Sequence, residues 1–224
     1  MNNKKSIIIV AAIITIAFIA LLIYFVKRTP PDLSKLIVDS STVTSPASSS
    51  VATSTIKNSD FSLPVSDALT RVTKKPFGIN ISPDNSPVIP ENFTGYHTGV
   101  DFETTASEQN SEVPVFAICS GPLQLKKVAT GYGGVAIQSC RIKEESVTII
   151  YGHLRLESVN ISLNTMINQG HMIGILGKGY SQETAGERKH LHLGIHKGTT
   201  VSLLGYVPTK DGLDQWIDFL TLVK

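Results

Sequence analysis

The longest apolar run of the sequence lies near its start. Residues 7–26 are apolar except for Thr15 and Tyr24, and basic residues flank the run on both sides. A helix of about 20 residues spans roughly 30 Å, which matches the hydrocarbon core of a bilayer. The run is longer than the apolar core of an ordinary signal peptide, and no cleavage site with small residues follows it. We therefore predict an N-terminal transmembrane signal anchor over residues 1–28, with a cleaved signal peptide as the alternative.

A polar segment separates this run from the rest of the chain. Between residues 40 and 55 most residues are Ser or Thr, and none is charged. A stretch of this composition cannot bury enough apolar surface to offset the entropy lost on ordering. We predict a disordered linker over residues 29–69 and a folded domain over residues 70–224.

Short apolar runs predict a mainly β domain beyond the linker. Glycine, proline and asparagine separate these runs, as expected for the turns of an antiparallel β-sheet or sandwich. Apolar residues between 213 and 220 recur at i, i+3, i+4 and i+7, which predicts a short C-terminal amphipathic helix over residues 214–222. The predicted strands cover residues 113–118, 123–128, 134–139, 146–151, 172–176 and 190–196.

Composition and charge exclude several classes of protein. The 224-residue chain has a net charge of +2 and no basic stripe interleaved with aromatic residues, so no nucleic-acid partner is expected. The glycine-rich stretch at residues 131–134 lacks the Lys-Ser/Thr pair and the helix start of a phosphate-binding loop. Two cysteines are too few for a disulfide-rich scaffold or a four-cysteine zinc site.

Two histidines lie two residues apart in a predicted strand. His190 and His192 alternate with the apolar residues Leu191 and Leu193. Side chains at i and i+2 of a strand point to the same face, so we expect both imidazoles side by side. Such a pair can hold a metal ion, or provide one ligand and one acid–base group. Two histidines on a solvated strand face are the alternative interpretation.

A second cluster of potential ligands lies upstream. His97 and Asp101 have an even spacing, and on one strand both would share a face with Gly99. A catalytic zinc site takes three nitrogen or oxygen ligands and leaves a fourth position for water, so one later histidine would complete the set. A surface pair near a turn is the alternative. His153 follows the predicted strand 146–151. Alone it would more often be a structural histidine, and it becomes a candidate site residue only together with these two clusters.

Several motifs, in this order, resemble those of the lysostaphin-type (LytM-like) zinc metallopeptidases: HTGVD, VPVFAICSG, GYGGVAIQ, YGHL, QGHMIGILG and KHLHLGIH. The resemblance covers about residues 77–207. It implies an antiparallel β domain of the duplicated hybrid motif type, with a narrow active-site groove across one sheet. It also implies a zinc ion at the floor of the groove and cleavage of peptide bonds in peptidoglycan stems or cross-bridges.

The resemblance assigns roles to individual residues. His97, Asp101 and His192 are the expected ligands of one zinc ion, and His153 and His190 are the expected catalytic histidines. Zinc lowers the pKa of a bound water to about 7, and a histidine with an ordinary pKa near 6.5 can then accept and pass on a proton. The other histidine can hydrogen-bond the tetrahedral oxyanion. Which histidine performs which step stays open at this point.

Some features depart from the family pattern. Residues 178–189 form a longer and more charged segment than the short Ser/Thr- and Gly-rich turn usual before HLH, and we expect this segment to shape the groove rim and the substrate preference. His171 stands where the family often has Gln and is expected to be structural or exposed, and His196 is expected to be solvated. Cys119 and Cys140 are expected to form a disulfide outside the membrane, with two buried thiols or extra zinc ligands as alternatives.

The resemblance implies a zinc endopeptidase that hydrolyses peptidoglycan peptides, and the N-terminal apolar run predicts that it is anchored in a membrane. Its C-terminal domain would lie outside the cytoplasm, held by a single-pass anchor formed by residues 7–26. A catalytically silent module that binds cell wall or activates other wall hydrolases is the alternative. Silent members typically lose metal ligands, whereas every site position is occupied in this chain, so we favour the enzyme. A peptidase that processes proteins shares the same chemistry and stays open.

Overall fold

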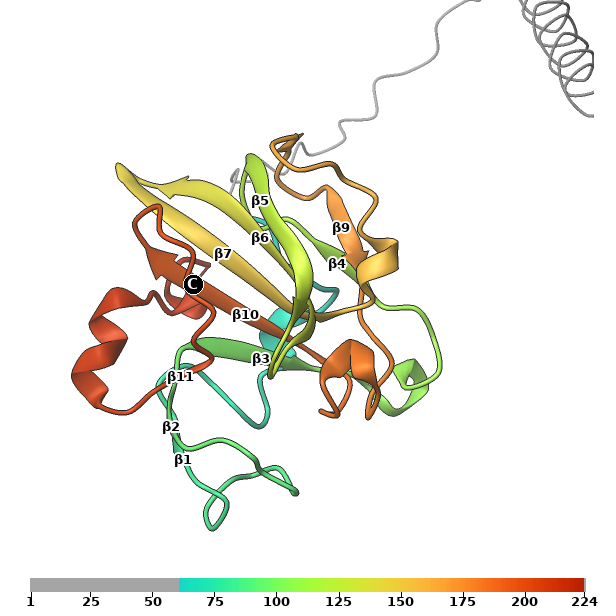
Figure 1. Cartoon of the computed structure of the whole chain (residues 1–224), viewed down its shortest axis with the longest axis vertical. Helices are drawn as coiled ribbons and strands as arrows, with labels where there is room; N and C mark the ends of the chain where they lie inside the picture. The colour runs from blue at the N-terminus through green and yellow to red at the C-terminus, as the bar shows by residue number, and fades with distance from the viewer. Residues whose placement is uncertain (1–60, 224) are drawn as a thin grey trace, which may run out of the picture. The chain divides into compact units, whose positions relative to one another are not determined.

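The computed structural model of the chain describes residues 61–223. Within these residues the strands form a six-stranded sheet in the order β3-β10-β7-β6-β5-β8, a three-stranded sheet β1-β2-β11 and the pair β4-β9 (Figure 1). All pairings are antiparallel, which confirms the predicted mainly β class. The strands are β1 (Asn80–Ile81), β2 (Gly95–His97), β3 (Gly99–Glu103), β4 (Pro114–Phe116), β5 (Gly121–Ala129), β6 (Gly133–Ile142), β7 (Glu145–Leu154), β8 (Met166–Ile167), β9 (Met172–Ile175), β10 (His190–Lys197) and β11 (Tyr206–Val207).

The helical elements of the described residues are all short 3-10 turns. One precedes the first strand, and the others lie in the connections between strands and near the C-terminus (Figure 1). The turns are η2 (Ala68–Thr70), η3 (Ala106–Glu108), η4 (Leu156–Ser158), η5 (Gln182–Thr184), η6 (Lys210–Gln215) and η7 (Phe219–Thr221).

The predicted strands are confirmed as β4, β5, β6, β7, β9 and β10. Their sequences are rich in β-branched residues and reach turn residues at both ends, which is why local pattern located them. β1, β2, β8 and β11 escaped prediction because each has only two or three residues. So short a strand exists only through its neighbours in the sheet.

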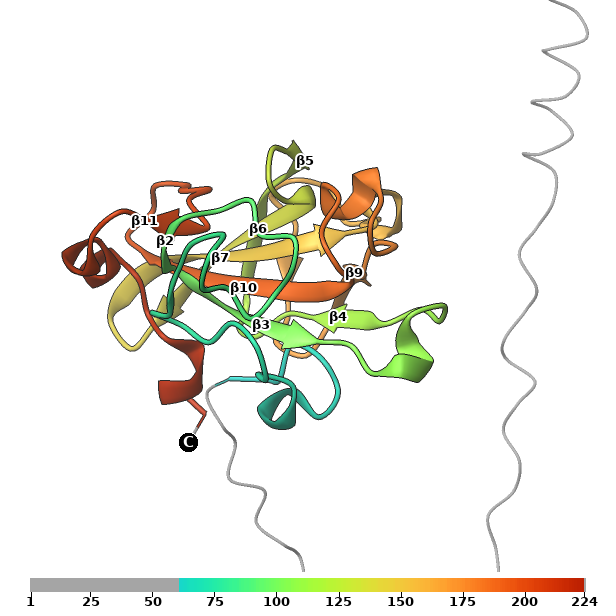
Figure 2. The same ribbon diagram turned by 90° about the horizontal axis from the view of Figure 1, so that it is seen from below.

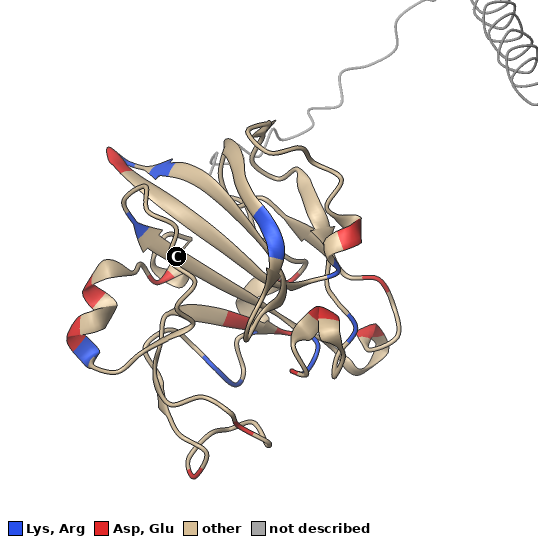
Figure 3. Ribbon diagram, viewed as in Figure 1, with Lys and Arg blue, Asp and Glu red and all other residues tan. Residues whose placement is uncertain are grey.

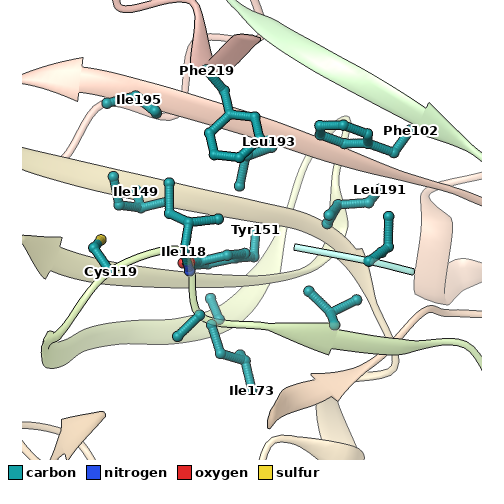
Figure 4. Close-up of a cluster of buried hydrophobic side chains, with 14 of the residues drawn as sticks. Phe102, Ile118, Cys119, Ile149, Tyr151, Ile173, Leu191, Leu193, Ile195 and Phe219 are labelled. Atoms are coloured by element: carbon teal, nitrogen blue, oxygen red, sulfur yellow. The ribbon is translucent and has the colours of Figure 1, made fainter. Parts of the chain in front are cut away.

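The central strand β10 separates the hydrophobic core from the face that bears the histidines. Leu191, Leu193 and Ile195 alternate into the core, where Leu193 lies opposite Tyr151 of β7 (Figure 4). The intervening residues point to the opposite face of the sheet. β3, β10 and β7 run side by side, so residues of three strands can meet on that face (Figure 2).

Charged residues lie mainly in loops and at strand ends, while β7 and β10 carry few along their length (Figure 3). A buried charge is costly unless it is paired, so the few charges inside the domain need partners. Arg71 illustrates this arrangement, because its guanidinium donates to both carboxylate oxygens of Glu108 on η3 at 2.6 and 2.8 Å.

Cys119 and Cys140 form a disulfide, as the sequence predicted. It ties the segment before β5 to β6, across a sequence separation of 21. Closing a loop of this length restricts the unfolded chain and is worth about 3 kcal/mol in the chain-entropy model.

We expect the double substitution Cys119→Ser, Cys140→Ser to lower the free energy of unfolding by about 3 kcal/mol. Urea unfolding of the whole chain, followed by fluorescence of Trp216, measures this change. Reduction of the unsubstituted chain should produce a similar loss. Equal stability of both forms would contradict a structural role for the disulfide.

The predicted C-terminal helix over residues 214–222 is wrong. Two 3-10 turns, η6 and η7, occupy this stretch, and Trp216 between them is extended. Trp216 pairs with His196 in a β-bridge, and the backbone N–H of Ile217 donates to the carbonyl of Ile195 at 2.9 Å. Asp218 then caps the second turn through its side chain. Pairing with the end of β10 therefore outweighs the helical spacing of the apolar residues.

The packed region begins earlier than the expected boundary at residue 70. Phe61, Val65 and Ala68 are buried members of the hydrophobic core. The expected anchor over residues 1–28 and most of the linker over residues 29–69 lie outside the described residues. Among residues 61–223 no helix is long and apolar enough to cross a membrane.

Candidate metal centre and catalytic cleft

Three side chains from separate strands converge on one point. His97 ends β2, Asp101 lies in β3 and His192 lies in β10, directly opposite Asp101 in the strand register. His97 Nε2 is 3.0 Å from His192 Nδ1 and 3.3 Å from Asp101 Oδ1, which is 3.2 Å from His192 Nδ1. All three residues are buried. The sequence therefore identified a set of potential ligands that does meet in space.

The route by which His97 and Asp101 meet differs from the expectation. They were expected on one strand, whereas His97 belongs to the three-stranded sheet and Asp101 to the six-stranded sheet. The chain changes sheets at Thr98, whose hydroxyl and backbone N–H donate to the carbonyls of Leu204 and Gly205. The approach of His97 to Asp101 thus depends on contacts with a distant segment, which the spacing of residues along one strand cannot reveal.

The donor atoms suit a divalent ion such as Zn²⁺. Tetrahedral zinc with ligands at about 2.0–2.2 Å places neighbouring donors about 3.3 Å apart, close to the separations here. His97 Nδ1 lies 3.2 Å from the carbonyl of Pro76, and His192 Nε2 lies 3.4 Å from the hydroxyl of Tyr132. Because a carbonyl can only accept, His97 carries its ring proton on Nδ1, as is usual for metal-binding histidines, whereas the Tyr132 hydroxyl can either accept from or donate to His192 Nε2. With the His192 proton also on its outer nitrogen, two nitrogen lone pairs and a carboxylate oxygen face one point, an arrangement that suits a cation.

Electrostatics keeps these groups in the protonation states that a metal ion needs. Burial lowers the pKa of His192 to about 4, against the opposing hydrogen bond with Asp101, so the ring is neutral at pH 7. Burial acts to raise the pKa of the Asp101 carboxyl, but the surrounding histidines outweigh it and hold this pKa well below its ordinary value. Burial raises the pKa of the Tyr132 phenol, which stays protonated. A neutral imidazole at His192 and a carboxylate at Asp101 are therefore present at neutral pH.

Gly99 provides the space that the His192 ring occupies. A Cβ at this position would lie 2.7 Å from both Cε1 and Nε2 of His192 and 2.7 Å from the carbonyl oxygen of Leu193. The clash would be with the ring of a candidate ligand and with backbone that cannot yield.

We expect Gly99→Ala to displace His192 and to weaken zinc binding by at least about 10-fold, the lower end of the effect of disturbing a ligand's surroundings. Zinc affinity measured by competition with a chelator checks this. Gly205→Ala is the matched control, because its Cβ would meet the Tyr132 hydroxyl at 3.4 Å, an ordinary contact. Wild-type affinity in Gly99→Ala would show that the ring does not need this space.

Two further histidines, His153 and His190, lie beside the three candidate ligands. His190 Nε2 is 3.2 Å from Asp101 Oδ2, and its Nδ1 is 2.9 Å from the carbonyl of Arg188. The rings of His153 and His190 are 4.3 Å apart between centroids. His153 adopts a left-handed backbone with φ of 62°, and its buried Nδ1 has no hydrogen-bond partner among the described residues. Such strain in a non-glycine residue is typical of functional sites.

A cleft of about 230 Å³ opens over these histidines. Phe93, Tyr132 and Tyr206 contribute aromatic walls, and the Phe93 and Tyr206 rings stack at 5.3 Å. Lys75 is buried at the same place and is paired with Glu91. Burial, reinforced by the neighbouring charge of His190, lowers the pKa of His153 well below its ordinary value. His153 is therefore a neutral group in a cleft walled by aromatic rings.

The structure separates these residues from the other histidines. His171 is exposed, which agrees with the expectation that it is either structural or exposed. His196 was expected to be solvated, but its ring is half-buried and packs edge-on against Trp216 at 4.8 Å. Trp216 reaches it through the β-bridge at the end of β10. Neither histidine lines the cleft.

Sequence reasoning missed several residues of the site. Tyr132 lay in the recognised GYGG stretch, but nothing in the sequence connected it with His192. Lys75, Phe93 and Tyr206 come from distant segments and have no pattern of their own. Arg188 was treated as part of a rim, whereas its guanidinium reaches Asp101 Oδ2 at 2.8 Å. A charged residue two positions before the HLH motif was the available signal.

Comparison with known proteins gives one family match. The model of Peptidase family M23 matches residues 95–203, a region that contains all of the ligands and histidines described above. None of the curated proteins compared matches the chain.

Solved structures that the chain matches include Csd3 of Helicobacter pylori, with 23% identity, a TM-score of 0.42, and coverage of 66% of this chain and 35% of that chain. The catalytic domain of the antimicrobial peptidase lysostaphin from Staphylococcus simulans is 20% identical, with a TM-score of 0.43 and coverage of 67% and 89%. A zinc containing peptidase from Vibrio cholerae is 19% identical, with a TM-score of 0.39 and coverage of 60% and 35%. The chain thus spans about a third of the length of the first and third of these proteins.

Proposed function

Since residues 95–203 form a domain of peptidase family M23, we propose that this chain is an active zinc-dependent endopeptidase that hydrolyses peptide bonds in peptidoglycan stem peptides or cross-bridges. M23 peptidases are zinc-dependent metalloendopeptidases. His97, Asp101 and His192 would hold one zinc ion, which acidifies a water molecule and polarises the scissile carbonyl when bound.

The two other histidines supply proton transfer and charge stabilisation. His190 is oriented by the hydrogen bond from its Nδ1 to the carbonyl of Arg188, so its Nε2 faces the ligands. We assign to His190 the acceptance of the water proton and its transfer to the leaving amine. His153, neutral and beside His190, can donate a hydrogen bond to the oxyanion that forms on the scissile carbonyl. The aromatic walls of the cleft limit the access of bulk water to these steps.

The observation that carries the proposal is the convergence of three donor atoms within 3.0–3.3 Å of one another, next to two histidines that are not part of the triad. A silent module that only binds cell wall needs neither a complete ligand set nor His153 in a strained conformation. The alternative of a binding or activating module therefore leaves these features without a purpose.

Digestion of purified cell walls by the whole chain tests the proposal. Release of peptide amines should stop when a chelator removes zinc, and zinc should restore it. A protein that binds zinc at the site but releases no amines, alone or with added zinc, would favour the silent module. Digestion of unfolded protein substrates in preference to walls would favour the protein-processing alternative.

Membrane anchoring and an extracytoplasmic position are further parts of the proposal. Residues 7–26 have the length and composition of a single-pass anchor. The Cys119–Cys140 disulfide supports an oxidising compartment, since such bonds rarely persist in the cytosol. Protease treatment of intact, wall-stripped cells should degrade the C-terminal domain, whereas protection from the protease would place it inside.

A further inference from the structure

Arg188 bridges two carboxylates next to the candidate metal centre. Its Nη2 donates to Asp101 Oδ2 at 2.8 Å, and its Nε donates to both carboxylate oxygens of Glu103 at 2.9 and 3.0 Å. Asp101 and Glu103 are two residues apart in β3, so their side chains share the face that bears the histidines. The guanidinium is only 6% exposed, although it belongs to the segment expected to form a rim.

The contacts of Asp101 are divided between its two oxygens. Oδ1 lies 3.3 Å from His97 Nε2 and 3.2 Å from His192 Nδ1, whereas Oδ2 accepts from Arg188 and lies 3.2 Å from His190 Nε2. A carboxylate held by its outer oxygen presents one oxygen to a metal ion. Without that contact it is free to rotate or to bind through both oxygens, which alters the number of ligands. Hydrogen bonds to a ligand carboxylate are a recognised means of fixing its orientation.

The geometry of Arg188 suits this task better than a simple positive charge would. An arginine presents its donors in a rigid planar fork that matches carboxylates, whereas a lysine presents one flexible point charge. Glu103 holds one edge of the fork, and this anchoring fixes the nitrogen that reaches Asp101. The guanidinium charge also offsets part of the charge of the buried Asp101 carboxylate and the partly buried Glu103 carboxylate.

We propose that Arg188 is a positioning residue of the metal centre, which anchors on Glu103 and fixes Asp101 so that Oδ1 alone faces the ion. This role rests on the proposed function for the identity of the ion as zinc, but it concerns metal binding and coordination and not hydrolysis. It also gives the charged segment at residues 178–189 a part in building the site.

The test compares the whole chain with its Arg188→Lys, Arg188→Met and Arg71→Met variants. Arg71 is the matched control, because it is 8% exposed and binds Glu108 on η3 through two nitrogens. Arg71 also donates to the backbone carbonyl of Glu103 at 3.2 Å, but its side chain bonds neither to the Glu103 carboxylate nor to Asp101. Each metal-free protein is checked for folding by circular dichroism. Zinc affinity is then measured by competition with a chromophoric chelator, and Co²⁺ loading reports coordination through its visible absorption spectrum.

We expect Arg188→Met to weaken zinc binding by about 10- to 100-fold, the usual effect of removing a partner of a metal ligand. Its visible Co²⁺ absorption should lose intensity, because Asp101 would no longer bind the ion through one oxygen alone and the number of ligands would change. Arg188→Lys should fall between this variant and the wild type, and it carries the test if Arg188→Met does not fold. Arg71→Met should keep wild-type zinc affinity and Co²⁺ spectrum while its melting temperature falls.

Wild-type affinity and an unchanged Co²⁺ spectrum in the folded Arg188 variants would overturn the proposal. An equal loss of affinity in Arg71→Met would also overturn it, because the effect would then come from general destabilisation. A wild-type chain that binds zinc but does not digest walls would contradict the proposed function and leave the role of Arg188 intact. A wild-type chain that does not bind zinc would contradict both the proposed function and the role of Arg188.

Discussion

Replacing His97 by alanine is expected to abolish zinc-dependent digestion of cell walls, because the ion loses one of its three protein ligands. Structural zinc sites with four ligands bind with about 10–16 kcal/mol, or about 2.5–4 kcal/mol for each ligand. Losing one ligand should therefore weaken zinc binding by roughly 10²- to 10³-fold. The zinc content of the purified variant, measured by mass spectrometry, and its rate of wall digestion check this expectation.

His171→Ala is the control for this substitution, since it removes an exposed imidazole. It should keep both zinc and activity. Near-wild-type digestion by the folded His97→Ala variant would mean that His97 is not a ligand. Equal loss in both variants would point to a general effect of removing a histidine.

Replacing His190 by alanine is expected to have the second large effect, with the metal retained. His190 approaches Oδ2 of Asp101, the oxygen that does not face His97 and His192, so its loss leaves the three donor atoms in place. A positioned general acid–base group typically contributes about 10²- to 10⁴-fold to the rate. We expect kcat to fall by this factor while the zinc content stays at one ion per chain, a split that separates a proton-transfer group from a ligand.

His196→Ala is the matched control, because this residue lies on the same face of β10 but packs against Trp216. It should keep zinc and turnover, with at most a loss of stability. Loss of zinc from His190→Ala would reassign His190 as a ligand. Unchanged turnover would remove it from the proton-transfer steps.

The sequence allowed the architecture and the main site to be predicted because their signals are local or repeated. The long strands were predicted from short apolar runs bounded by turn residues. His190 and His192 lie on one face because residues two apart in a strand point to the same side. The disulfide was also predictable, since the chain has no other cysteine with which either partner could pair.

Other features depend on contacts that no local pattern encodes. The helical spacing near Trp216 was overridden by pairing with β10, which supplies hydrogen bonds that an isolated helix would lack. His97 and Asp101 meet because the chain changes sheets between them. Arg188 reaches Asp101 across a separation of 87 residues, so its contact depends on the pairing of β3 with β10. In each case tertiary structure decides where the side chain lies.

The position of the metal ion tests the account most directly. Crystals of the zinc-loaded chain, measured at the zinc absorption edge, locate the ion by its anomalous scattering. The account predicts one ion within about 2.0–2.2 Å of His97 Nε2, Asp101 Oδ1 and His192 Nδ1. An ion held through His153 or His190 in place of one of these ligands, or no ion at this position, would contradict it.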